Sequence, residues 1–279
     1  MTRLTGADLV GLDDWAAYDQ LIQDALGVDL PALGALAAGR PAAWVAERLA
    51  GRRLAAVSVS TGQGVLAGFA EALAAIGRRL GLAGAAMPSP DEEGLREAEA
   101  WGADLVIQAD DDCFWVRDLA EGRVADNNPA TSRAFVAALE LLDGGPLAGR
   151  EVLVLGLGVI GRGAAARLLE LGAWPLLYDP DPEKGPAALA EAGGGEIVAD
   201  AGGLVRALSR TGLIVEAVPH RAALPERLMA ALLESGSVRV AAPGVPLSWP
   251  TAWLKPGGSA RLWHDPLPSG VAAMLALVA

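Results

Sequence analysis

The chain has little of the chemistry on which disulfide-bonded and metal-binding proteins depend. Its 279 residues include one cysteine, Cys113, and two histidines, His220 and His264. A single cysteine excludes an internal disulfide and a cysteine-ligated zinc cluster, and two histidines leave little for a histidine-metal site. We therefore expect no metal ion in this protein.

Long apolar runs and an excess of positive charge are also missing. No apolar run reaches the roughly 18 residues that a membrane span needs, and the N-terminus lacks the apolar stretch of a signal peptide. The 34 acidic residues outnumber the 22 basic ones, so the net charge is −12 and would repel a nucleic-acid backbone. We expect a cytoplasmic protein that binds neither a membrane nor nucleic acid.

The dominant pattern is a helical start followed by alternating strands and helices. Apolar residues recur at helical spacing in residues 1–50, and Pro31 and Pro41 divide this region into short helices. We expect later strands at 54–60, 103–109, 151–155, 174–178, 212–217 and 237–241, and helices at 65–80, 91–101, 129–142, 159–171 and 269–279. This alternation predicts an α/β fold in which helices cover parallel sheets in both halves.

A Gly/Pro cluster at 143–146 is the best boundary between two such series. We expect a helical N-terminal segment at 1–52 and an α/β substrate-binding domain at 53–146. A Rossmann-type domain with a doubly wound parallel sheet should follow at 147–279. Whether the last helix packs back on the middle domain stays open.

A glycine fingerprint follows the strand predicted at 151–155 and opens a helix. It consists of Gly156, Leu157, Gly158, Val159, Ile160 and Gly161. Gly156 permits a tight turn, Gly158 lets a pyrophosphate approach the backbone, and Gly161 lets helix and strand pack closely. The alternative is a glycine-rich turn in an α/β domain that binds no nucleotide.

Asp179 ends the next predicted strand, 23 residues after Gly156. A carboxylate there can accept hydrogen bonds from the ribose hydroxyls of adenosine, and it would repel a 2′-phosphate. The fingerprint and this acid together predict NAD as the cofactor rather than NADP.

Polar residues also follow predicted strands of the middle domain. Ser60 begins a Ser/Gly loop that suits a carboxylate or forms an ordinary helix start. Asp110 is the first of three aspartates that would attract a cation, although such a run is usually a solvated turn. Asn127 offers an amide within ordinary turn chemistry. His264 and Asp265 could form an acid/base pair, and both histidines are more often structural.

These motifs, in this order, resemble the pyrrolysine synthase (PylD) family over nearly the whole chain. The segments that carry the resemblance are Ser60–Gly64 with Phe69–Glu71, Ala109–Asp112, Ala125–Pro129, Val154–Gly161 with Tyr178–Asp179, Glu216–Pro219, Ala242–Pro246 and Asp265–Leu267. The family has Glu where this chain has Asp265.

The resemblance implies oxidation by NAD of the terminal amine of lysine-Nε-(3R)-methyl-D-ornithine. Ammonia is then released, and the aldehyde closes on the ornithine α-amine with loss of water to form pyrrolysine. The residues it implies for the substrate are Leu4, Ser60, Phe69 and Asn127; for catalysis Asp110 and Asp265; and for the cofactor Pro219 and Pro243, besides the glycine loop and Asp179. Which carboxylate is the base and which the anchor stays open.

Two other functions stay open. The chain could be an NAD-dependent dehydrogenase of another amino or imino acid, or a catalytically silent module that senses NAD. In the enzymatic case the partner is a small dipeptide-like molecule. The sequence leaves a homodimer open.

Overall fold

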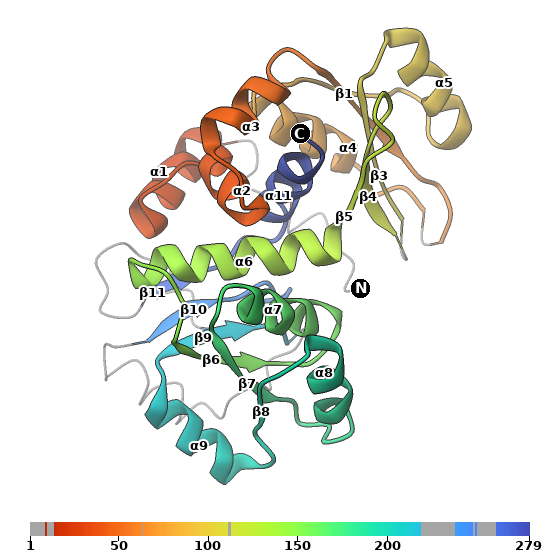
Figure 1. The fold of residues 1–279 in the computed structure, drawn as a ribbon. Coiled ribbons are helices and arrows are strands. Elements are labelled where there is room, and N and C mark those ends of the chain that lie inside the picture. The colour runs from red at the N-terminus through yellow and green to blue at the C-terminus, as the bar shows by residue number, and fades with distance from the viewer. Residues whose placement is uncertain are drawn as a thin grey trace. The chain divides into compact units, whose positions relative to one another are not determined.

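The computed structural model describes residues 9, 14–62, 64–110, 113–218, 238–247, 249 and 261–279. These residues form two compact units, which Figure 1 shows together. Unit 1 comprises the described residues of 1–20, 28–134 and 267–279, and unit 2 those of 21–27 and 135–266. The three predicted domains stay a prediction, because the units group the chain by contacts alone.

The helical start consists of α1 (Trp15–Leu26), α2 (Leu30–Ala38) and α3 (Ala42–Leu49). The Asp29 carboxylate caps α2 by accepting from the N–H of Ala32 at 2.8 Å, and Pro31 occupies its first turn. Pro41 immediately precedes α3. The expectation that the two prolines divide this region into short helices is confirmed. Among the helices that the structure describes, none alone is long and apolar enough to span a membrane; α1 and α2 qualify only as a pair bent by 53°.

Unit 1 contains a five-stranded sheet in the order β2-β1-β3-β4-β5. Its strands are β1 (Arg53–Ser58), β2 (Ala83–Ala86), β3 (Leu105–Ala109), β4 (Phe114–Asp118) and β5 (Val124–Asp126). The pairs of β1 with β2 and β3 are parallel, but β3–β4 and β4–β5 are antiparallel. The expectation of a fully parallel sheet is therefore wrong here. Only short turns separate β3, β4 and β5, and a short turn can join antiparallel but not parallel strands.

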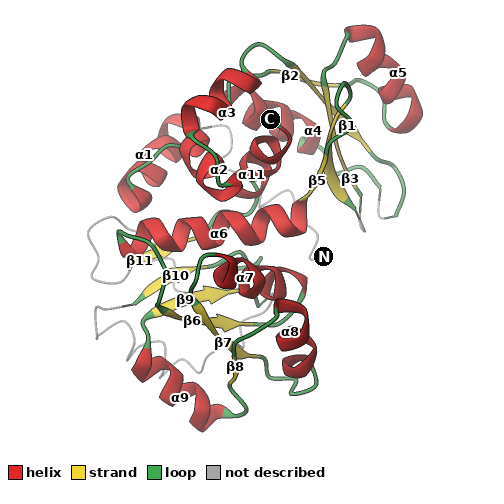
Figure 2. Cartoon of the chain, in the orientation of Figure 1, coloured by secondary structure: helices red, strands yellow, loops and turns green. Residues whose placement is uncertain are grey.

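The helices α4 (Phe69–Arg79), α5 (Asp91–Trp101) and α11 (Pro268–Val278) belong to unit 1. They are among the helices drawn in red in Figure 2. Helix α4 begins four residues later than expected, because Gly68 before it has a left-handed backbone with φ 81°. Helix α11 is almost entirely buried and packs against α2, α4, β4 and β5. A Cβ at Gly34 of α2 would lie 2.8 Å from the carbonyl oxygen of Ala272. The last helix thus packs on α2 of the helical start and on α4, β4 and β5 of the segment that follows.

A buried carboxylate, that of Asp118, stabilises the C-terminal end of β4. Asp118 accepts from Arg52 at 2.9 Å and from the N–H groups of Ala120 and Glu121 at 3.0 Å, and its side chain is 1% exposed. Burial raises the pKa of this carboxyl, but the hydrogen bonds from Glu121 and Arg52 outweigh it, so the pKa lies below its ordinary value.

Unit 2 contains a six-stranded sheet in the order β11-β10-β9-β6-β7-β8, and all its pairs are parallel. The strands are β6 (Glu151–Leu155), β7 (Trp174–Tyr178), β8 (Glu196–Ile197), β9 (Leu213–Glu216), β10 (Arg239–Ala241) and β11 (Arg261–Trp263). Counted from β8, the strands run third, second, first, fourth, fifth and sixth in the chain. This is the order of the doubly wound dinucleotide-binding fold, so the Rossmann prediction is confirmed.

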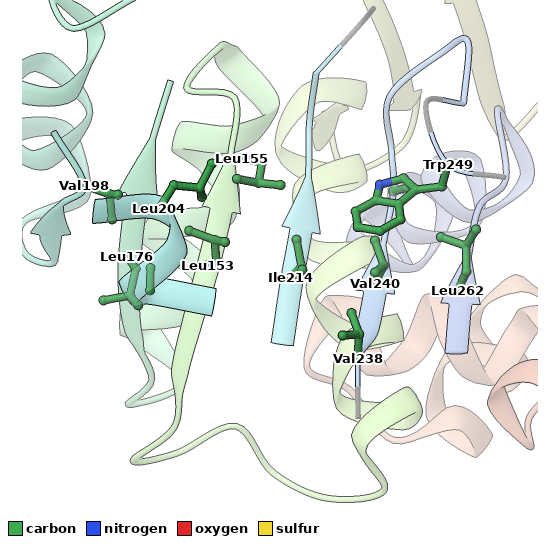
Figure 3. Close-up of a cluster of buried hydrophobic side chains, with 12 residues drawn as sticks. Leu153, Leu155, Leu176, Val198, Leu204, Ile214, Val238, Val240, Trp249 and Leu262 are labelled. Carbon is green, nitrogen blue, oxygen red and sulfur yellow. The ribbon is translucent and has the colours of Figure 1, made fainter. Parts of the chain in front are cut away.

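Helices lie on both faces of this sheet. Helix α7 (Val159–Glu170) packs on the face of Val154, and α8 (Lys184–Ala192) packs against α7. Helix α9 (Ala201–Arg210) covers the other face, where the buried cluster of Figure 3 lies. This cluster consists of Leu153, Leu155, Leu176, Val198, Leu204, Ala207, Ile214, Val238, Val240, Ala242, Trp249 and Leu262. Helix α6 (Asn127–Asp143) begins among the residues of unit 1 and ends among those of unit 2.

Candidate functional site

Two glycines of the fingerprint are required by packing within unit 2. Gly156 follows β6 with φ 86°, and a Cβ there would lie 2.8 Å from Cγ2 of Val218 and 2.9 Å from the carbonyl oxygen of Ala217. A Cβ at Gly161 would overlap the carbonyl oxygen of Gly156. The turn and the contact between α7 and β6 therefore exclude side chains at both positions.

Gly158 is different, because nothing in the fold requires a glycine there. Its φ of −68° suits any residue, and a Cβ would meet no atom within 4 Å. Gly158 is also the N-cap of α7, and no side chain caps this helix. A helix N-terminus with open space beside it fits the pyrophosphate of a dinucleotide. Of the other loop residues, Leu157 is buried, Ile160 is half-buried and Val159 is exposed.

Asp179 lies beside this loop and contacts it directly. Its Oδ2 accepts from the N–H of Leu157 at 2.8 Å, and its Oδ1 accepts from the N–H of Asp181 at 2.9 Å. Nζ of Lys184 lies 3.3 Å from both carboxylate oxygens. Asp179 thus positions the glycine loop, and its contact with a ribose stays a prediction. The sequence analysis did not identify Lys184. In the structure it is the first residue of α8.

Further residues lie where β9, β10 and β11 end, at the same edge of the parallel sheet. Glu216 ends β9 and is completely buried. Half-buried Pro243 follows β10, and buried Asp265 follows β11. Nδ1 of His264 donates to the carbonyl oxygen of Ala242 at 2.8 Å, since a carbonyl can only accept. An acid/base pair of His264 and Asp265 stays a prediction, and Pro219 and His220 lie outside the described residues.

In unit 1, the register of the sheet brings most of the expected substrate residues to one edge. Ser58 of β1 pairs with Ala109 of β3, so Ser60 and Asp110 follow neighbouring parallel strands. Ala109 also pairs with Phe114, and Trp115 pairs with Asp126, so β4 begins and β5 ends at the same edge. Asn127 follows β5 directly. Leu4 lies outside the described residues.

Two aromatic rings lie at this edge. Phe69 begins α4, and its ring packs edge-on against that of Phe114, with centroids 5.8 Å apart. Phe114 is buried and Phe69 is half-buried. Phe69 can therefore offer apolar surface to a ligand while Phe114 supports it.

Ser60 is held by a carboxylate of the protein itself. Its N–H donates to Oδ1 of Asp91 at 2.9 Å, and its Oγ–H donates to Oδ2 of the same residue. These bonds, the hydroxyl first and the backbone second, lower the pKa of Asp91. The Ser60 donors that we expected to suit a ligand carboxylate thus bind Asp91. Sequence reasoning missed Asp91, which lies 31 residues away.

Asp110 is fixed by the turn between β3 and β4. Its Oδ1 accepts from the N–H of Cys113 at 2.6 Å, and its own N–H donates to the Cys113 carbonyl at 2.8 Å. Asp111 and Asp112 lie outside the described residues. Within the described part of the chain, no group of three or more His, Cys, Asp or Glu side chains could hold a metal ion.

Asn127 is oriented by its neighbour on α6. Oγ1 of Thr131 donates to Oδ1 of Asn127 at 3.1 Å, which leaves Nδ2 as the side that can donate to a ligand. A Cβ at Gly270 of α11 would lie 2.6 Å from Oγ1 of Thr131 and 3.0 Å from Oδ1 of Asn127. The absence of a side chain at Gly270 therefore leaves room for this pair.

Two dehydrogenases are among the solved structures with a similar fold. Quinate dehydrogenase from Corynebacterium glutamicum, in complex with NAD, aligns with a TM-score of 0.52 and 17% identity over 81% of this chain and 93% of its own. Shikimate 5-dehydrogenase (AroE) from Thermus thermophilus, in complex with NADP(H) and shikimate, aligns with a TM-score of 0.50 and 18% identity over 80% and 91%. These likenesses confirm the fold class.

Relatives in sequence are more specific. Residues 14–125 match the family described as pyrrolysine biosynthesis protein PylD, N-terminal domain. Pyrrolysine synthase of Methanosarcina acetivorans is 29% identical over 224 residues, which cover 78% of this chain and 79% of the relative. That of Methanosarcina barkeri is 27% identical over 278 residues, or 99% and 97%. The prediction of an enzyme with an oxidoreductase fold is confirmed, and the family model and both relatives support the resemblance to the pyrrolysine synthase (PylD) family.

Proposed function

We propose that this enzyme uses NAD to oxidise the terminal amine of lysine-Nε-(3R)-methyl-D-ornithine and closes the product to pyrrolysine. The observation that carries the proposal is the shared sheet edge in unit 1. Ser60, Asp110 and Asn127, which match the family pattern, follow strands that end at that edge. An acidic and a polar group at one edge suit a substrate that carries several amines.

The cofactor half of the proposal rests on the glycine loop of unit 2. The open space at Gly158 and the uncapped start of α7 suit a pyrophosphate. The carboxylate of Asp179 favours NAD over NADP, because a ribose 2′-hydroxyl could donate a hydrogen bond to it and a 2′-phosphate could not. NAD, when bound, accepts the hydride. By family resemblance, Pro219 and Pro243 would lie near the cofactor.

The proposed reaction balances in three steps. Hydride leaves the carbon that bears the terminal amine, which gives an imine, NADH and a proton. Water hydrolyses the imine to an aldehyde and ammonia. The aldehyde then condenses with the α-amine of the same ornithine, which forms the ring C=N bond and releases water.

Asp110 would orient the ammonium group of the substrate and accept its proton, directly or through water, because hydride transfer needs the nitrogen lone pair. Asp265 is the second candidate for this role. Nδ2 of Asn127 would donate to an oxygen of the substrate, and Phe69, with Leu4 by resemblance, would contact its apolar carbons.

The direct test incubates the purified protein with NAD and the dipeptide. We expect equal amounts of NADH and ammonia, and one cyclised product identified by mass spectrometry. NADH formation only with other amines would indicate a different amino-acid dehydrogenase. Tight NAD binding without turnover on any amine would indicate an NAD-sensing module.

Two substitutions separate the halves of the proposal. Asp179→Ala should weaken NAD binding far more than dipeptide binding, and an equal loss of both would assign Asp179 to the fold. Asp110→Asn should abolish turnover and leave NAD affinity within about twofold. Unchanged turnover would remove Asp110 from the site.

A further inference from the structure

The contact between Ser60 and Asp91 has a feature that a merely structural hydrogen bond does not need. Asp91 has φ 57°, and it is the one non-glycine residue with positive φ in the described part of the chain. Such a backbone is uncommon outside glycine, and aspartate and asparagine adopt it more readily than other residues. Here it turns the carboxylate toward both donors of Ser60.

These bonds decide which kind of group Ser60 can meet. A serine hydroxyl has one donor and two lone pairs. Because the hydroxyl proton and the N–H of Ser60 both go to Asp91, only the lone pairs of Oγ remain for a ligand. Ser60 is exposed and follows β1 at the sheet edge that also carries Asp110. A ligand atom at Ser60 must therefore be a hydrogen-bond donor.

The negative charge of Asp91 indicates which hydrogen-bond donor of a ligand would bind at Ser60. In the part of the chain that the structure describes, Asp91 forms no salt bridge, whereas Glu92 of the same helical turn pairs with Arg96. The negative charge beside Ser60 is thus left for a cation from outside the protein. The lowered pKa of Asp91 makes it a fixed charge and a poor proton acceptor.

We propose that Asp91 is a positioning residue that makes Ser60 an acceptor for an ammonium group of the substrate. This inference rests on the proposed function, and it adds that the group bound at Ser60 is cationic and not a carboxylate. In the opposite arrangement, Asp91 accepts the two hydrogen bonds of Ser60 only until the substrate binds. A substrate carboxylate then accepts these bonds in its place. The two arrangements predict opposite effects of removing the charge.

The decisive variant is Asp91→Asn. Asparagine tolerates the left-handed backbone as well as aspartate does, so the variant should fold. Its amide can donate to Oγ and reverse the role of the hydroxyl. Glu93→Gln is the matched control, because it removes one charge from the same first turn of α5. Ser60→Ala removes the acceptor, and Ser60→Thr retains it.

We expect Asp91→Asn and Ser60→Ala to weaken binding of the dipeptide by about ten- to hundredfold, as measured by calorimetry. KM should rise by a similar factor while kcat and NAD affinity change little. Glu93→Gln should stay within about twofold of wild type, and Ser60→Thr should recover most of the affinity. A purely structural role would not separate KM from kcat in this way.

Equal effects of Asp91→Asn and Glu93→Gln would overturn the inference. Tighter binding of the dipeptide, or of acetate as a carboxylate probe, by Asp91→Asn would establish the opposite arrangement. Failure of the proposed function would look different, because wild type would then neither bind nor oxidise the dipeptide. In that case the affinities of the variants for L-lysine and D-ornithine are measured by calorimetry. We expect the variants to rank in the same order of affinity as for the dipeptide.

Discussion

The candidate ligand sites at the edges of the two sheets are built from different parts of the chain. At the edge of the six-stranded sheet, the backbone makes the site: Gly158 leaves open space at the start of α7. At the edge of the five-stranded sheet, side chains make it: Asp91 holds Ser60, and Thr131 holds Asn127. Added side chains should therefore disrupt the first site, and lost hydrogen bonds the second.

The largest effect is expected for Gly161→Ala. The new methyl group would overlap the backbone of Gly156 where α7 crosses β6, and neither element can yield cheaply. We expect a loss of about 4 kcal/mol or more in the free energy of unfolding, measured in urea, together with loss of NAD binding. A stable variant that binds NAD would contradict the packing role of this glycine.

The next largest effect concerns a buried charge in the five-stranded sheet. Asp118→Asn leaves Arg52 without its partner, so we expect a loss of about 2–4 kcal/mol at pH 7. The folded pKa of Asp118 lies below the ordinary 3.8, so its contribution is present at neutral pH and is lost as the pH falls below about 4.

The unfolding free energies of wild type and Asp118→Asn should therefore converge in acid. Urea unfolding between neutral pH and about pH 3 measures this. Glu121→Gln is the control, because its side chain is 49% exposed and its ion pairs should contribute less than about 1 kcal/mol. A gap that stays constant with pH would contradict the assigned pKa direction.

Gly158→Ala should separate binding from folding in the six-stranded sheet. The added Cβ meets no protein atom, so the free energy of unfolding should change by less than about 1 kcal/mol. The methyl group would stand where we place the pyrophosphate, so NAD affinity should fall by about tenfold or more, measured by fluorescence titration. Unchanged affinity would move the cofactor away from this loop.

The smallest effect is expected at Thr131. Thr131→Val removes the hydroxyl that orients Asn127 and keeps the shape of the side chain. KM for the dipeptide should rise about three- to tenfold with NAD affinity unchanged, and Thr131→Ser should restore it. Gly270→Ala, which crowds the same pair, should act in the same direction. An equal rise in KM for Thr131→Ser would assign the effect to packing.

The difference between the sheets also explains what could be predicted from the sequence. The glycine loop is legible because its strand, turn and helix are contiguous, so each glycine can be assigned a task from spacing alone. Strands β6 and β7 accordingly have the predicted bounds. The sequence did not predict the antiparallel strands β4 and β5, because the residues between β3 and β4 carry no hairpin motif and the strands are short.

The partners of the site residues were harder to predict. Asp91 reaches Ser60 from 31 residues away, and nothing in either segment indicates the pairing. Lys184 contacts Asp179 from the next helix. Such contacts depend on how loops meet at the edge of a sheet. The hydrophobic periodicity of the sequence predicts helices and strands but not these contacts. The residues themselves could be proposed from strand ends and family resemblance, whereas their charge states and orientations required the structure.

The place of α11 has a consequence for synthesis of the chain. The ribosome completes α2, α4, β4 and β5 early, yet the helix that covers them emerges only after all of residues 135–266. Until then the face of α2 around Gly34 lacks its packing partner, Ala272 of α11. Unit 1 therefore begins first and is completed last. While the sheet of unit 2 is synthesised, the apolar surface that α11 will cover can aggregate with other chains.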